Sequence, residues 1–314
     1  MRARPIRWQR VVATLFMIGA TAWLAALLTQ AWPEVVASVR EARIDILLLA
    51  WGLSLLALLL TAEQFHLLIV APGPQSAAGT PRRVTYRLLI FGNIARHVPG
   101  RFWGVAYQIA AVRGLIAGSA VVSVNSLLAL VHLGLAIVAA AAVLLPALLA
   151  PATIAALALG AVLLFVALLR WRNGLSALAA RLPQQGRLSL ALARTLQQMA
   201  KIPTPIILGC VAWGALSWLL YFAAWGYFGQ SLSSLAFFEG VRLAALYTLA
   251  WLCGFLVVIA PSGLGVREVV FLALTQSYTP EDQILFAAAG RLWLLVNDIT
   301  TAALAWIFGR EAKP

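Results

Sequence analysis

Residues Ser119–Leu145, SAVVSVNSLLALVHLGLAIVAAAAVLL, contain no Lys, Arg, Asp or Glu, and they decide the fold class of this chain. A membrane-crossing helix needs about 20 consecutive apolar residues to traverse a hydrocarbon core of about 30 Å. Inside lipid the backbone polar groups must be satisfied within the segment, and a helix achieves this. The stretch therefore predicts a transmembrane helix.

Five further apolar runs have the length and hydropathy of membrane spans. They are Val11–Ala31, Ile44–Val70, Thr153–Leu169, Ile206–Phe228 and Gln283–Phe308. The first run exceeds the roughly 7–15 apolar residues of a signal peptide, so we expect it to be an uncleaved span. Hydrophobic residues make up 63% of the chain and charged residues 11%, against about 45–50% and about 25% in soluble domains. This composition excludes a soluble protein and predicts an all-α polytopic membrane protein with about six transmembrane helices.

Two other apolar regions are interrupted by Pro and Gly. Leu88–Leu115 is broken at His97–Arg101, and Val241–Ser277 is broken at Ala260–Gly265. Each region predicts a re-entrant helical hairpin that enters the membrane, turns at the break and leaves on the same face. Residues 241–260 are also long enough to span the membrane alone, and this alternative stays open.

The order span, span, hairpin, span occurs twice along the single predicted membrane domain. The halves are residues 1–145 and 146–314, and their spans run in opposite directions. This is the pattern of an inverted-topology repeat, in which broken helices at corresponding positions mark the binding site near the bilayer midplane.

The formal net charge of +13 indicates orientation, because cytoplasmic loops retain Lys and Arg. Basic residues concentrate at both ends of the chain, around Arg82 and within Arg170–Lys201. We therefore expect both termini in the cytoplasm, a bacterial inner membrane, and contacts with anionic lipid head groups instead of nucleic acid. The segment 173–199, interrupted by Pro183 and Gly186, predicts one or two amphipathic helices on the inner leaflet.

A few charged residues lie in or beside the apolar segments. Because a charge at the centre of a membrane helix costs about 2.5–3.5 kcal/mol, we expect these residues to pair or to line a wet cavity. Guanidinium groups beside a helix N-terminus favour a phosphate. The predicted substrate-binding residues are Arg96, His97, Arg101 and Trp103 at the first break, and Ser262, Arg267, Glu268 and Arg291 at or beyond the second.

Three embedded acids have alternative roles. Glu268 could pair with an arginine of another element, such as Arg291, or bind a proton. Glu63 and Asp298 are predicted to take part in coupling or pairing, and for Glu63 a transport role and a packing role are equally favoured. The two cysteines lack metal-ligand spacing, and no nucleotide-binding or hydrolase motif is present. We expect no metal, no cofactor and no catalytic residue.

The run Pro261-Ser262-Gly263-Leu264-Gly265-Val266-Arg267-Glu268, with Arg291 downstream, resembles the signature of the lysylphosphatidylglycerol synthase transmembrane-region family. The run His97-Val98-Pro99-Gly100-Arg101-Phe102-Trp103 resembles that family's first break, and the resemblance covers nearly the whole chain. It implies the flippase-like membrane half of an aminoacyl-phosphatidylglycerol synthase. These 314 residues contain no aminoacyltransferase domain, so we expect a stand-alone member that does not aminoacylate lipid.

The predicted function is a transporter that moves a lipid between leaflets. Its cargo would be a phospholipid, such as aminoacyl-phosphatidylglycerol, or a polyprenyl-phosphate-linked sugar. The alternatives are an intramembrane lipid-modifying enzyme and a non-catalytic membrane partner of a glycosyltransferase. A second copy of the chain or a lipid-processing enzyme is the expected protein partner.

Overall fold

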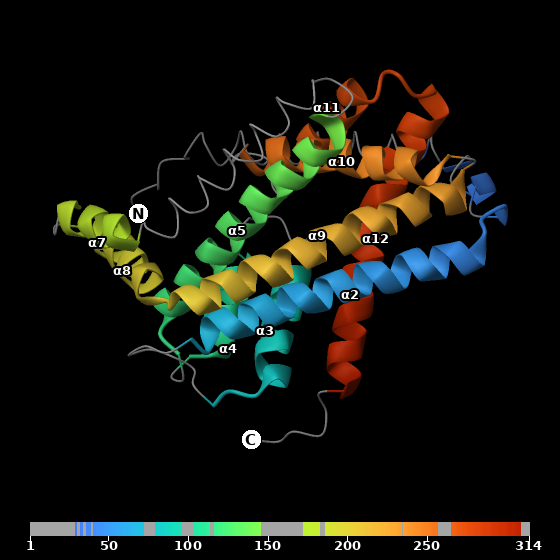
Figure 1. The fold of residues 1–314 in the computed structure, drawn as a ribbon. Coiled ribbons are helices and arrows are strands. Elements are labelled where there is room, and N and C mark those ends of the chain that lie inside the picture. The colour runs from blue at the N-terminus through green and yellow to red at the C-terminus, as the bar shows by residue number, and fades with distance from the viewer. Residues whose placement is uncertain are drawn as a thin grey trace, which may run out of the picture. The chain divides into compact units, whose positions relative to one another are not determined.

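The computed structural model shows an all-α polytopic membrane protein (Figure 1). The described residues are 29, 32–33, 36–38, 40–71, 79–95, 103–113, 116–145, 172–182, 186–233, 235–256 and 265–308. These residues contain helices and connecting turns and no strand. The fold class predicted from hydropathy is thus confirmed.

Five helices are long and apolar enough to cross a membrane. They are α2 (Ile44–Ile69), α5 (Gly118–Leu144), α9 (Thr204–Leu232), α10 (Phe237–Leu256) and α12 (Pro280–Phe308). Four of them match predicted spans, whereas α10 lies in the region predicted as the second hairpin. Its 20 residues reach the length that a span needs. The predicted span 153–169, and nearly all of 11–31, lie outside the described residues.

Three short helices border the two predicted breaks. α3 (Arg82–Ala95) and α4 (Trp103–Ala111) flank the first break, and α11 (Val266–Leu274) follows the second. With 14, 9 and 9 residues they are too short to cross a bilayer. Residues 96–102 and 257–264, which hold the first break and all of the second except Gly265, lie outside the described residues.

α3 packs closely against α4 through two glycines. A Cβ added to Gly104 would lie 2.5 Å from the carbonyl oxygen of Gly92, so a larger residue does not fit without movement. Small residues allow membrane helices to approach closely in this way. The two arms of the first predicted hairpin therefore lie side by side.

The basic segment after α5 forms two helices. α7 (Arg172–Arg181) and α8 (Arg187–Lys201) are two separate helices, which is one of the two alternatives that the sequence left open. Gly186, directly before α8, has φ of 103°, which a residue with a side chain rarely adopts. α8 is tied to α5 by a hydrogen bond of 2.7 Å that Ser123 Oγ donates to Gln198 Oε1.

Contacts divide the chain into two compact units. Unit 1 comprises residues 1–51, 96–101 and 222–297, and unit 2 comprises residues 52–95, 102–221 and 298–314. These contact-based units differ from the two predicted sequence halves. The described helices α2 to α5 lie in the first predicted half and α7 to α12 in the second, and the repeat itself stays a prediction. The inverted orientation, the inner membrane and the cytoplasmic termini stay predictions.

Buried polar groups join three spans within unit 2. α2 and α9 run antiparallel and side by side, with Thr61 opposite Ser217 at 3.3 Å (Figure 1). The side-chain amide of Gln64 donates to the backbone carbonyl of Cys210, and its oxygen lies 2.8 Å from Nε2 of His132 on α5. Polar side chains between membrane helices each contribute about 0.6–2 kcal/mol to association. Gln64 therefore links α2, α5 and α9.

Candidate functional site

Three charged side chains gather inside unit 1. Arg267 and Glu268 lie in the first turn of α11, and Arg291 lies in α12. Arg267 is 7% exposed and Glu268 is 2% exposed. Nη1 of Arg291 lies 3.1 Å from Oε1 of Glu268, which is the ion pair that the sequence offered as one of two alternatives for Glu268.

The start of α11 positions Glu268. Gly265, which precedes the helix, has φ of +79°, and its backbone N–H donates to Oε2 of Glu268 at 2.9 Å. A glutamate at the third helical position commonly reaches back to the backbone in this manner. The other carboxylate oxygen faces Arg291, in an ion pair whose geometry falls outside that of a hydrogen bond. One carboxylate thus fixes the helix start and binds a neighbouring helix.

Arg267 is held by aromatic groups. Its Nη1 donates to the hydroxyl of Tyr247 at 3.4 Å, and its Cζ lies 5.3 Å from the centroid of the same ring. Tyr247 in turn packs against Trp225 at 4.8 Å and Phe271 at 5.4 Å between ring centroids. Cation–π contact and a neutral hydroxyl hold the guanidinium in place without neutralising it.

The cluster has more positive than negative charge. Arg267 and Arg291 supply two guanidinium groups and Glu268 supplies one carboxylate, which pairs with Arg291; among the described residues no carboxylate forms a salt bridge with Arg267. Burying a charged group is costly unless a group of opposite charge is buried beside it. Guanidinium groups bind carboxylates and phosphates through paired N–H donors. The cluster is therefore suited to an anion.

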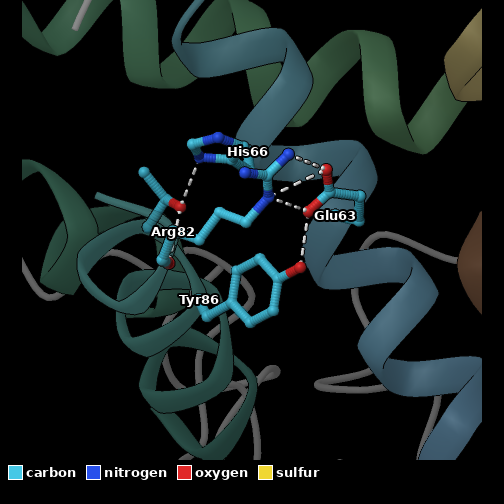
Figure 2. Close-up of polar contacts among 5 residues, drawn as sticks. Glu63, His66, Arg82 and Tyr86 are labelled. Atoms are coloured by element: carbon cyan, nitrogen blue, oxygen red, sulfur yellow. Dashed lines mark hydrogen bonds and ion pairs between the residues drawn. The ribbon is translucent and has the colours of Figure 1, made fainter. Parts of the chain in front are cut away.

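A second ion pair lies in unit 2, where α2 meets α3 (Figure 2). The carboxylate of Glu63 accepts hydrogen bonds at 3.0 Å from both Nε and Nη2 of Arg82, and also one from the hydroxyl of Tyr86. Nδ1 of His66 lies 2.9 Å from Oγ1 of Thr85. The bond to Glu63 raises the pKa of the Arg82 guanidinium, so the pair stays ionised. Glu63 therefore binds an arginine and joins two helices, as the packing alternative expected.

The remaining predicted site residues are distributed as follows. Arg96, His97, Arg101 and Ser262 lie outside the described residues. Trp103 begins α4 and is 53% exposed. Asp298 belongs to unit 2, where it is buried and its backbone carbonyl accepts a hydrogen bond from Thr301.

Sequence reasoning missed four residues of these clusters. Arg82 was assigned only to a basic loop, because the 19 residues that separate it from Glu63 carry no periodic signal. Tyr86, Trp225 and Tyr247 are not among the predicted site residues. For Tyr247 the sequence did contain a signal, namely a tyrosine within the apolar run that forms α10. A buried tyrosine hydroxyl usually has a hydrogen-bond partner, so this residue could have been expected to contact a polar group.

No group of three or more His, Cys, Asp or Glu that could hold a metal ion occurs in the described part of the chain. Comparisons with family models, with curated proteins and with solved structures found no match to this chain.

Proposed function

We propose that the protein is a lipid translocator that moves a phosphate-bearing lipid between leaflets. The observation that supports this most is the excess guanidinium charge of Arg267 and Arg291 over Glu268 inside apolar helices. A lipid phosphate is the anion that the surrounding bilayer supplies in quantity. A phospholipid or a polyprenyl-phosphate-linked sugar would satisfy this chemistry, and the resemblance of the Pro261–Glu268 run implies the same class of substrate.

Each residue of the cluster has a role in the proposal. Arg267 binds the lipid phosphate, aided by the positive N-terminal end of α11. The phosphate competes with Glu268 for Arg291, so that this ion pair opens when substrate arrives and closes when it leaves. The acyl chains remain in the hydrocarbon throughout. No bond is made or broken in the lipid, so the protein acts as a transporter and not as an enzyme.

Lipid movement in proteoliposomes tests the proposal. Vesicles containing a fluorescent phosphatidylglycerol are treated with dithionite, which bleaches only the outer leaflet unless the protein delivers inner-leaflet label. A hydrogen bond to a charged group contributes about 1.5–3 kcal/mol. Loss of one such bond in the transition state predicts roughly 10- to 100-fold slower movement for Arg267→Gln. Arg242→Gln is the matched control, because Arg242 is an exposed arginine of the same unit.

The variants separate charge from fold. Arg267→Lys keeps the charge but loses paired donation, so its rate should fall between those of wild type and Arg267→Gln. If wild type and Arg267→Gln move phosphatidylglycerol, phosphatidylcholine and polyprenyl phosphate at equal rates, the proposed role of the cluster is wrong. A covalently altered lipid in the mass spectrum of the same vesicles would instead favour the lipid-modifying alternative.

A further inference from the structure

A cavity of about 210 Å³ lies beside α3 within unit 2, whereas the residues of the Arg267 cluster belong to unit 1. Three helices of that unit, α2, α3 and α12, line it with apolar and basic side chains. Its lining residues are Leu55, Leu59, Arg83, Tyr86, Arg87, Ile90, Thr301, Leu304 and Ala305. The volume is below the roughly 300–1,000 Å³ of a typical small-molecule pocket. It suits part of an acyl chain better than a complete ligand.

The basic side chains of the cavity occur on one turn of α3. Arg83 and Arg87 are four residues apart, so both lie on the same face of the helix. The nearby carboxylate of Glu63 is occupied by Arg82 and Tyr86. Arg83 forms no salt bridge with any carboxylate in the described ranges. The wall of the cavity is almost entirely apolar and includes the apolar stems of Arg83 and Arg87, and Glu63 does not balance the charge of Arg83.

The apolar wall opens toward the surface of the unit. Leu59 and Leu304 are 43% and 41% exposed, although both belong to helices that are apolar enough to span a membrane. Arginine side chains place their apolar stems along such a wall and their guanidinium groups at the level of lipid head groups. The guanidinium of Arg87 also lies 5.9 Å from the ring of Phe91, which restricts its position.

We propose that this cavity binds an anionic phospholipid, with one acyl chain along Leu59 and Leu304 and the phosphate at Arg83 and Arg87. Anionic lipids are abundant in the membrane leaflet to which the sequence assigns the basic loop around Arg82. The site shares no residue with the proposed transport cluster and does not depend on transport. Its lipid is a bound component of the protein, whereas the proposed transport substrate passes through.

The contacts of Glu63 with Arg82 and Tyr86 hold α3 in place beside the cavity. The Tyr86 hydroxyl donates to Glu63 while the same side chain lines the cavity. Arg82 fixes the first turn of α3 on α2 through the same carboxylate (Figure 2). The neighbouring Arg83 and Arg87 are thereby held at the cavity. Glu63 is thus a positioning residue and does not contact the lipid itself.

Native mass spectrometry of the purified full chain in detergent tests the site. Three probes are titrated: dioleoyl-phosphatidylglycerol, dioleoyl-phosphatidylcholine and soluble glycerol 3-phosphate. We expect phosphatidylglycerol to bind at least about tenfold more tightly than phosphatidylcholine, and glycerol 3-phosphate to show no binding at the same concentrations. All measurements are repeated in an Arg267→Gln background, which removes the contribution of the proposed transport cluster.

Two variants separate the charge from the apolar wall. The double variant Arg83→Gln/Arg87→Gln should weaken phosphatidylglycerol binding by at least about tenfold. Leu304→Trp fills the cavity without changing any charge and should also weaken binding. Arg113→Gln removes an exposed arginine of the same unit and should bind as wild type does.

Several results would overturn the site. These are equal binding of the two phospholipids, unchanged binding by the double variant, or binding of glycerol 3-phosphate as tight as that of the lipid. A loss of binding counts only when the variant elutes as wild type does in size-exclusion chromatography. A variant that fails this criterion is replaced by the single substitution Arg83→Gln, with the same expected direction.

Discussion

Replacing Glu268 by Gln should destabilise the protein strongly, because it leaves the buried guanidinium of Arg267 and the partly buried guanidinium of Arg291 without a carboxylate in their cluster. Removing one partner of a fully buried ion pair typically costs about 3–5 kcal/mol. The Glu268 side chain is 1% exposed and the Arg291 side chain is 19% exposed, so water reaches only one of the partners. Gln can still accept the N–H of Gly265, which retains the cap at the start of α11. We therefore expect a cost of about 2–4 kcal/mol, below the fully buried range.

The free energy of unfolding can be measured in mixed micelles with an increasing fraction of SDS, followed by tryptophan fluorescence. Glu281→Gln is the matched control, because it makes the same chemical change at an exposed position of the same unit. Surface substitutions of this kind usually change stability by less than about 0.5 kcal/mol. The double variant Glu268→Gln/Arg291→Gln completes a mutant cycle.

The cycle reports the coupling between the two side chains. Residues in direct ionic contact couple by about 0.5–3 kcal/mol, so the double variant should be more stable than the sum of the two single effects predicts. If Glu268→Gln costs no more than Glu281→Gln, or if the effects of the pair simply add, the ion pair contributes nothing to the interior of unit 1. The reasoning about its charge balance would then be wrong.

Three further predictions use the same unfolding measurement or thiol labelling. Glu63→Gln should lower the free energy of unfolding by about 1–2 kcal/mol, less than Glu268→Gln does, because the arginine partner of Glu63 is 64% exposed. A loss equal to or larger than that of Glu268→Gln would contradict this. Gly104→Ala should cost about 1–3 kcal/mol through overpacking. Gly134→Ala, where nothing lies within 4 Å, should be neutral or stabilising. An apolar maleimide should label Cys253, which is exposed, and should not label Cys210 until SDS unfolds the protein. Labelling of both thiols before unfolding would show that the reagent reaches the packed face of α9 that holds Cys210.

Hydropathy predicted most of the fold because a membrane helix is specified by its own length and composition. α2, α5, α9 and α12 all lie where apolar runs predicted them. The sequence did not determine whether residues 241–260 cross the membrane alone or form one arm of a hairpin, since the length of α10 fits both. Local composition does not distinguish these two cases.

The charged pairs show where sequence reasoning succeeded and failed. The pair of Glu268 and Arg291 was one of two alternatives that the sequence offered, because few acids occur in the apolar segments and each needs a partner. The partner of Glu63 was missed, since Arg82 occurs in a run of arginines that also has the composition of a cytoplasmic loop. Pairing between distant helices depends on their packing, which hydropathy does not contain.

The position of Gln64 has a consequence for how the chain is made. Its partner His132 follows 68 residues later and its partner Cys210 follows 146 residues later. At a synthesis rate of about 5–20 residues per second, these partners emerge roughly 3–14 s and 7–30 s after it. During that interval α2 is already synthesised while the side-chain amide of Gln64 lacks its final partners. The ribosome thus sets the order in which this polar link is completed: first to α5, and only later to α9.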